Sequence, residues 1–117
     1  MDVKSFEDLI VWQKSIDLVV LIYALVEDFP KEEIFGLSSQ MKRAAVSIPS
    51  NIAEGNRRNT LKDRKHFMIM AFGSTAEIET QLEIARRLSY GKKEQYEKIE
   101  QLLSEVARML NKMSSQY

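Results

Sequence analysis

The sequence predicts an all-α protein, an antiparallel up-down-up-down four-helix bundle, and three observations lead to this fold class. Apolar residues recur at spacings of three and four in four separate segments, as they do on one face of a helix. The connections between the segments are short and carry Pro30, Gly55 and Gly91, which end helices. No segment shows the alternation of apolar and polar residues that is typical of a β-strand. With 117 residues and 44% hydrophobic content, we expect one domain over residues 1–117.

The first predicted helix follows Ser5, which can cap it, and ends near Phe29, before Pro30. Its predicted inward stripe consists of Leu9, Trp12, Ile16, Val19, Val20, Tyr23 and Val26. Residues 18–26 are apolar all round, and this run is too short for a membrane span, which needs roughly 20 residues. We therefore expect the apolar residues outside the inward stripe to contact another subunit. These predicted interface residues are Leu18, Leu21, Ile22 and Leu25.

The second predicted helix begins between Lys31 and Leu37 and ends at Glu54, because Gly55 can adopt the left-handed conformation past a helix end. Pro49 inside it should bend the helix or reorganise it locally. Beside its apolar face runs a row of mostly short polar residues that faces a similar row on the third helix. The two rows are Gln40, Arg43, Ser47 and Asn51, and Ser74, Glu77 and Gln81.

These polar residues have two interpretations. We favour a buried network that fixes the register of the two helices, with Arg43 and Glu77 as its ion pair. A binding site is the alternative interpretation.

The third predicted helix begins near Leu61, because Thr60 and Asp63 have the spacing of a capping box, and Gly91 terminates it. Gly73 in its middle is expected to let a neighbouring helix approach closely. The fourth predicted helix has the most regular apolar stripe, which is typical of a bundle seam. This stripe consists of Tyr96, Ile99, Leu103, Val106, Leu110 and Met113.

Several segments together resemble one known family. The longest reads LSSQMKRAAVSIPSNIAEGNRR over residues 37–58. Others are Phe6, Leu9, Val11-Trp12-Gln13, Phe29-Pro30, Glu33, Ala71, Gly73-Ser74, Glu77 and Gln81. Over nearly the whole chain they resemble the four-helix bundle family named after the intervening sequences of bacterial 23S ribosomal RNA genes. The accessory proteins of diversity-generating retroelements are similar to this family.

Those accessory proteins assemble as pentameric barrels with a basic surface, bind nucleic acid and associate with a reverse transcriptase. The resemblance therefore implies a non-enzymatic homo-oligomer, a pentamer, with a nucleic-acid-binding or adaptor role. Its implied partners are RNA or DNA, and a reverse transcriptase or another protein. A structural protein-interaction scaffold that does not bind nucleic acid is the alternative function.

The charges are segregated along the chain although the net charge is zero. Residues 1–41 carry a net charge of −5, residues 42–65 carry +5, and residues 66–117 are balanced. Zero net charge argues against a generally basic nucleic-acid binder, but a local basic pole repeated around an oligomer could hold a phosphate backbone. The alternative is a solvated charged loop. The predicted nucleic-acid-binding residues are Lys42, Arg57, Arg58, Lys62, Arg64 and Lys65, with Arg43 behind them.

The sequence carries no pattern that predicts catalysis or a cofactor. The one histidine, His66, cannot supply the paired Glu-x-x-His motifs of a di-metal bundle, and no spacing places a serine nucleophile beside it. The four glycines stand singly, which excludes a glycine-rich phosphate loop. We therefore predict no enzymatic activity, metal or cofactor. The absence of cysteine and of a signal-peptide or lipidation pattern favours the cytoplasm.

Overall fold

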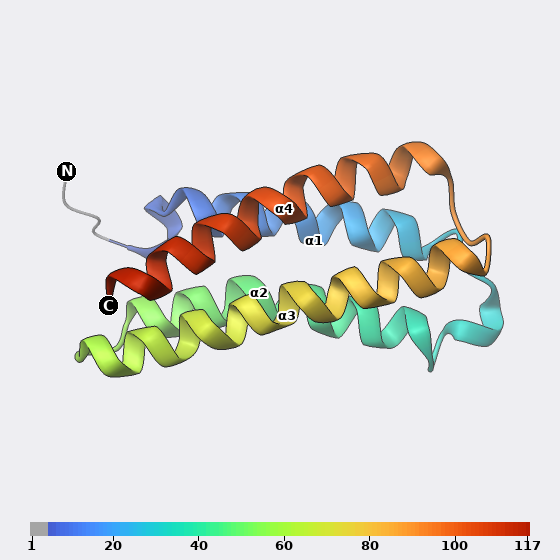
Figure 1. The fold of residues 1–117 in the computed structure, drawn as a ribbon. Helices are drawn as coiled ribbons and strands as arrows, with labels where there is room; N and C mark the ends of the chain where they lie inside the picture. The colour runs from blue at the N-terminus through green and yellow to red at the C-terminus, as the bar shows by residue number, and fades with distance from the viewer. Residues whose placement is uncertain (1–4) are drawn as a thin grey trace.

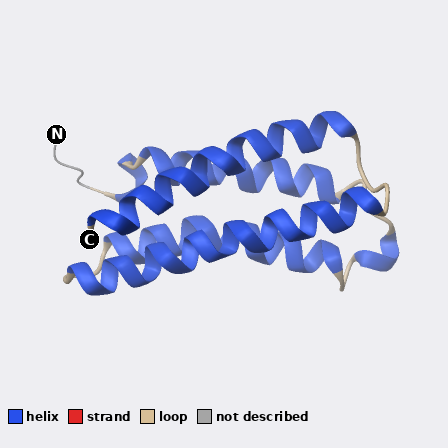
Figure 2. Ribbon diagram, viewed as in Figure 1, coloured by secondary structure: helices blue, strands red, loops and turns tan. Residues whose placement is uncertain are grey.

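The computed structural model describes residues 5–117, apart from the side chain of Asp8. The described residues form four α-helices and two short 3-10 helices, and they contain no strand (Figure 2). The 3-10 helices are η1 (Phe6–Asp8) and η2 (Lys31–Glu33), and the α-helices are α1 (Ile10–Val26), α2 (Leu37–Asn56), α3 (Leu61–Arg87) and α4 (Lys93–Gln116). The predicted all-helical class with four main helices is confirmed.

The helices lie along the long axis of a rod that measures 43 × 24 × 21 Å (Figure 1). Contacts join α1 to α2, α2 to α3, α3 to α4, and α4 back to α1, so the four helices surround a shared core. The turn between α2 and α3 lies at the same end as η1 and the C-terminal end of α4, and the other two connections lie at the opposite end (Figure 1). No helix in residues 5–117 is both long enough and apolar enough to cross a lipid bilayer.

The face of α1 that packs into the core differs from the predicted one. Leu18, Ile22 and Leu25 are fully buried within the chain, and Leu21 is half-buried against the same core. Val20, which belongs to the predicted inward stripe, is instead 63% exposed. The prediction that the buried leucines and isoleucine form an outer face is therefore wrong.

Ser15 explains this error. It is fully buried on the core face of α1, between Val11 and Leu18, and it interrupts the apolar stripe that the sequence would otherwise show. Its hydroxyl donates a hydrogen bond of 2.7 Å to the carbonyl oxygen of Trp12, so the polar group is satisfied without water. A small polar residue can therefore occupy the core face, while the apolar Val20 lies outside.

Neither Gly55 nor Gly73 has the role that the sequence predicted for it. Gly55 does not end α2, which continues to Asn56, and it lies buried where α2 meets α3. A Cβ atom at Gly55 would lie 2.9 Å from the Cβ of Phe67, closer than packed carbon atoms approach. Gly73 is exposed, and nothing lies within 4 Å of the corresponding position. The close approach of neighbouring helices therefore depends on Gly55.

Other helix limits follow the sequence closely. The side chain of Thr60 accepts a hydrogen bond from the amide of Asp63, and α3 begins at Leu61 as predicted. The stripe of α4 is buried from Tyr96 to Leu110. After α3 the chain turns through Gly91, whose φ of +77° is a conformation that glycine adopts without strain. Ser5 caps η1 rather than α1, so the first predicted helix is in fact two elements.

Candidate nucleic-acid interface

Five of the six predicted nucleic-acid-binding residues lie together at the turn between α2 and α3. Arg57 and Arg58 follow the last turn of α2, and the other three occupy the first turns of α3. Arg64 is half-buried, and the other four are exposed: Arg57, Arg58, Lys62 and Lys65. We call these five residues the basic end. It lies at one tip of the rod, at the same end as η1 and the C-terminal end of α4 (Figure 1).

The arginines of the basic end are held by aromatic rings and by the backbone. Arg58 pairs with Glu54 at 2.5 Å, and its guanidinium lies 4.8 Å from the ring centre of Phe67. The Nε of Arg64 donates a hydrogen bond of 2.8 Å to the carbonyl oxygen of Arg58. Arg57 lies over the ring of Phe6, at 5.2 Å. These contacts fix the guanidinium groups while leaving positive charge at the surface.

The electrostatic potential of this end is positive for two reasons. Within residues 5–117, Arg57, Lys62, Arg64 and Lys65 take part in no ion pair. The N-terminus of α3 adds the positive end of a helix dipole beside Lys62 and Lys65. Asp63 in the first turn of α3 offsets part of this charge. An anion bound here would be favoured by both the side chains and the helix end.

Lys42 is not part of the basic end, contrary to the prediction. It precedes Arg57 by 15 residues, which corresponds to about 22 Å along α2 at 1.5 Å per residue. Its ammonium group lies 5.0 Å from the ring centre of Tyr23 on α1. Arg43, the next residue, is exposed and equally far along the helix. The positive charge in the first turns of α2 is therefore a separate feature from the basic end.

The predicted polar network is present only in part. A hydrogen bond of 2.6 Å joins the hydroxyls of Ser47 and Ser74 across α2 and α3. The side-chain amide of Asn51 donates to the carbonyl oxygen of Ser47 at 2.8 Å. Gln81 is buried on α3, and its contact with Glu77 is long, at 3.4 Å.

The predicted ion pair between Arg43 and Glu77 is wrong. Both side chains are exposed, and neither belongs to any ion pair among residues 5–117. Arg43 lies farther around α2 from the core than Ser47 does, so its charge points into solvent. Glu77 lies farther around α3 than Ser74 in the same way. Gln40 is exposed in the same way. The contact between the polar rows is thus made by the two serines.

Sequence reasoning missed an exposed apolar surface on α1 and α2. Ile16, Val20 and Tyr23 follow one another at spacings of four and three on α1, and they are 36%, 63% and 41% exposed. Val46, which is 40% exposed, lies one helical turn after the Lys42 that contacts Tyr23. We call these four residues the α1–α2 apolar face. Ile16, Val20 and Tyr23 belong to the stripe of α1 that the sequence predicted to face inward. Assigning that stripe to the outside would have located this face.

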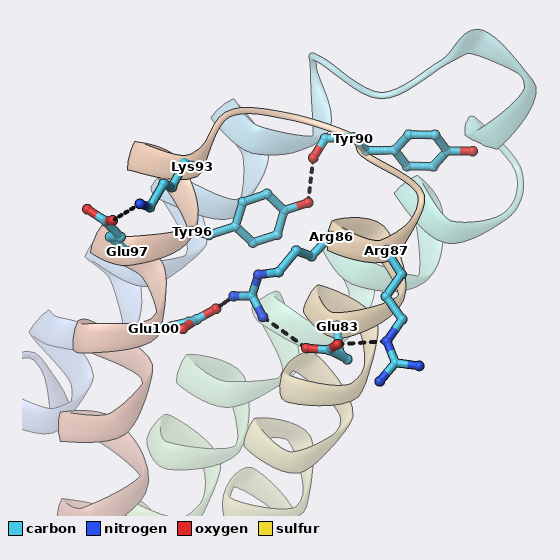
Figure 3. A network of polar contacts seen from close by, with 8 residues as sticks. All are labelled: Glu83, Arg86, Arg87, Tyr90, Lys93, Tyr96, Glu97 and Glu100. Atoms are coloured by element: carbon cyan, nitrogen blue, oxygen red, sulfur yellow. Dashed lines mark hydrogen bonds and ion pairs between the residues drawn. The ribbon is translucent and has the colours of Figure 1, made fainter.

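A second missed feature is a polar network that joins α3 to α4 at the far end of the rod (Figure 3). Arg86 lies over the ring of Tyr96 and pairs with Glu83, at 2.9 Å, and with Glu100. Arg87 also pairs with Glu83, and its hydrogen bond is the main cause that lowers the pKa of this carboxyl. The spacings of three and four between Glu83 and the two arginines could have predicted the part of this network that lies on α3.

Two tyrosines extend this network into the connections. The hydroxyl of Tyr96 donates to the carbonyl oxygen of Tyr90 at 2.6 Å, and burial raises its pKa. The hydroxyl of Tyr90 donates to the carboxylate of Glu33 at 3.0 Å, which raises the pKa of Tyr90. Beside the network lies a cavity of about 310 Å³, which we call the α3–α4 cavity. Its walls include Arg86, Tyr90, Gly91, Lys93, Tyr96 and Glu97.

The remaining chemistry of the described chain is sparse. His66 is exposed on α3, with its ring edge-on to Phe67. Among residues 5–117, no three histidine, aspartate or glutamate side chains gather closely enough to hold a metal ion.

Comparisons with known proteins agree with the resemblance read from the sequence. The 23S rRNA-intervening sequence protein family matches residues 7–112. A crystal structure from Bacteroides thetaiotaomicron VPI-5482, described as a protein with unknown function from the S23 ribosomal protein family, is similar with a TM-score of 0.82 and 28% identity. The similarity covers 90% of this chain and 98% of that chain. No curated protein matches the sequence. With the family signature and the four-helix fold both present, the chain belongs to the 23S rRNA-intervening sequence protein family.

Proposed function

We propose that this protein is a non-enzymatic homo-oligomer that binds the phosphate backbone of RNA or DNA through its basic end. The observation that carries the proposal is the gathering of Arg57, Arg58, Lys62, Arg64 and Lys65 on one turn, with a single ion pair among them. Positively charged groups at such a density attract a polyanion whose own charges are closely spaced. The rest of the chain carries a net charge of −5, which confines this attraction to one tip of the rod.

The chemistry of the basic end favours contacts to phosphate over contacts to bases. Phe6 and Phe67, the aromatic rings beside the arginines, are covered by the guanidinium groups of Arg57 and Arg58. They are therefore not free to stack on bases, which is how single strands are held by aromatic side chains. The lysines at the start of α3 offer charge without a fixed hydrogen-bonding pattern. Binding should consequently depend strongly on salt and weakly on sequence.

Oligomerisation would place several basic ends in one assembly. The α1–α2 apolar face supports it, because contiguous exposed apolar side chains are typical of association surfaces. The antiparallel up-down-up-down order, supported by the placement of the connections in Figure 1, would set each basic end at the same tip of its own subunit. The resemblance to retroelement accessory proteins implies a pentamer and a reverse transcriptase as partner.

A protein-interaction scaffold that does not bind nucleic acid is the second candidate. The same apolar face favours it, since that surface would suit a different protein as well as a second copy. The two functions differ in their dependence on salt. Retention of the protein on nucleic acid at low salt supports the first, and co-purification of a protein partner in the absence of nucleic acid supports the second.

The experiment measures binding of labelled single-stranded and double-stranded nucleic acids between about 50 and 200 mM salt. If a few subunits each contact one or two phosphates, the slope of log affinity against log salt should be about −3 to −6. Lys65→Gln should make this slope shallower by about 1 for each phosphate that Lys65 neutralises, whereas Lys98→Gln, which removes an exposed charge from α4, should not change it. Affinity that is independent of salt, or equal effects of both variants, would refute backbone binding by the basic end.

A further inference from the structure

Phe35 is the most exposed large apolar side chain of the described residues. It is 96% exposed in the connection between η2 and α2, and its neighbour Ile34 is 54% exposed. We call these two residues the Ile34–Phe35 tip. An aromatic ring that is wholly in water contributes nothing to the core of this chain. Its burial against another surface would remove the largest single area of exposed apolar side chain.

The backbone on both sides of the tip is held in place. The carboxylate of Glu33 accepts a hydrogen bond from the amide of Leu37 at 3.2 Å and another from the hydroxyl of Tyr90 at 3.0 Å. Gly36 makes room for this carboxylate, because a Cβ at that position would lie 2.9 Å from the Glu33 oxygen. The ring of Tyr90 in turn packs on Phe29 at 5.1 Å. The backbone that carries the tip is thus held in place, which reduces the backbone entropy lost when the tip binds.

The chain also carries a cavity that an aromatic ring could enter. The α3–α4 cavity has a volume of about 310 Å³, whereas an apolar cavity of about 150 Å³ is enough to hold benzene. Its charged walls are paired, Arg86 with Glu100 and Lys93 loosely with Glu97 at 4.0 Å, so an uncharged ring would strand no charge. The ring of Tyr96 and the backbone of Gly91 supply apolar surface.

The connection that carries the tip lies at the same end of the rod as the connection between α3 and α4 (Figure 1), whose residues Tyr90 and Gly91 line the cavity. The tip and the cavity face different sides of it, because the ring of Tyr90 points away from Tyr96 (Figure 3) and its hydroxyl reaches Glu33, next to the tip. Two subunits placed side by side in the same orientation would therefore bring the tip of one to the level of the cavity of the next. A contact between two different surfaces of identical chains is head-to-tail, and it closes a ring when the rotation between subunits allows it.

The charges around the two surfaces are complementary. Residues 27–33, which lead into the tip, carry four acidic side chains and one basic side chain. Residues 83–100, which hold the cavity walls and their ion-pair partners, carry five basic side chains and four acidic ones, a net charge of +1. Glu32 beside the tip and Lys93 on the cavity wall are both exposed. This opposite charge favours the head-to-tail arrangement and disfavours contact between two tips.

We infer that Phe35 of one copy inserts into the α3–α4 cavity of a second copy, so that the Ile34–Phe35 tip and this cavity form the two halves of one subunit contact. This inference rests on the proposed homo-oligomer and names where its subunits meet. An open row of subunits leaves one tip and one cavity unoccupied and can keep growing. A closed ring leaves neither free, so assembly stops there.

Two variants separate the halves of the contact. Phe35→Asp removes the tip and leaves the cavity, and Glu97→Trp fills the cavity and leaves the tip. Light scattering over a concentration series should show that each variant alone dissociates at a concentration at least tenfold higher than wild type. An equimolar mixture should form two-chain species at concentrations where each variant alone is a single chain, because one intact tip meets one intact cavity. Leu61→Asp, at the opposite end of the rod and 60% exposed, should assemble as wild type does.

The outcomes are distinguishable. Since Phe35 is exposed, Phe35→Asp should melt within about 2 °C of the single-chain wild type, so misfolding cannot account for weaker assembly. If wild type and Phe35→Asp, measured separately, assemble at the same concentration, this contact is overturned and the homo-oligomer stands. A wild type that is a single chain at 100 μM would overturn both. A mixture that stays as single chains would overturn the head-to-tail arrangement.

Discussion

The hydroxyls of Ser47 and Ser74 share a hydrogen bond of 2.6 Å that joins α2 to α3. Ser47 also contacts the carbonyl oxygen of Ala44, and Ser74 contacts that of Met70, so each hydroxyl belongs both to its own helix and to the neighbouring one. These short side chains let the two helices approach closely at this level, where larger polar groups would hold them apart. Gly55 permits the same approach two turns later along α2.

Replacement of Ser47 or Ser74 by alanine should reveal this hydrogen bond as a coupling energy. Each single variant should lose about 1 kcal/mol of unfolding free energy, or about 3–5 °C in Tm, and the double variant should lose less than the sum. Arg43→Ala and Glu77→Ala form the matched comparison, because those side chains are exposed and unpaired with each other. Their losses should be below about 1 kcal/mol and additive. Strong coupling between Arg43 and Glu77 would contradict the structure.

The two glycines of α2 and α3 provide a second matched pair. Gly55→Ala forces a methyl group against Phe67 and Met68, and the overpacking should cost about 1–3 kcal/mol after partial relief by the better helix propensity of alanine. Gly73→Ala adds a methyl group in open space and should stabilise the protein by about 0.5–1 kcal/mol. Thermal or denaturant unfolding of the two variants should therefore move in opposite directions from wild type. A stabilising Gly55→Ala would mean that the helices are farther apart than described.

The sequence predicted the fold best where the apolar pattern was unambiguous. The stripe of α4 alternates cleanly, and its buried residues from Tyr96 to Leu110 are the predicted ones. On α1, apolar residues surround the helix from residue 18 onward and Ser15 occupies the core face, so the period alone could not select between two stripes. The sequence also could not assign the roles of Gly55 and Gly73, because a single glycine looks the same whether it lies at a helix contact or in solvent.

The candidate sites were less predictable for a geometrical reason. The basic end is continuous in sequence, so residues 57–65 fall together whatever the tertiary packing. The separation of Lys42 follows from helix length alone and could have been deduced from the predicted helix. In contrast, the contacts of Arg86 with Glu100 and of Tyr90 with Glu33 depend on how α3, α4 and η2 meet, which the pattern of a single segment does not specify.

The pH dependence of stability should expose the link between α1 and α4. Lys14 donates a hydrogen bond of 2.6 Å to Glu105, and this bond, followed by the charge of Lys14, lowers the pKa of the carboxyl. A folded-state pKa below the unfolded value of about 4.3 means that the contribution is fully present above that pH. It is lost as the pH falls through the folded-state pKa. Wild type should therefore melt above Glu105→Gln at pH 7, and the two melting curves should converge at about pH 3.

Thermal melts of both proteins at intervals between pH 7 and pH 3 make this comparison. Glu83, whose pKa is also lowered, is present in both proteins and cancels in the difference. A difference in Tm that stays constant down to pH 3 would show that Glu105 contributes through packing instead of through its charge.

The α1–α2 apolar face provides the last prediction, because it replaces the interface that the sequence assigned to Leu18, Leu21, Ile22 and Leu25. Val20 is the most exposed of its four residues and makes little contribution to the core of a single chain. Val20→Glu should therefore leave the unfolding free energy of the single chain within about 0.5 kcal/mol of wild type. In the proposed oligomer the same change would bury a charge in an apolar contact, which is costly unless the charge is paired. Assembly measured by light scattering should shift to at least tenfold higher concentration.

Gln101→Glu introduces the same charge on the exposed surface of α4 and should leave assembly unchanged. Ile22 cannot serve in this test, because it is fully buried and a charge there would unfold the chain instead of separating subunits. Dissociation of a still-folded Val20→Glu chain would place the face in a subunit contact. Assembly of that variant at wild-type concentrations would remove the face from the oligomer and leave it for a different protein partner.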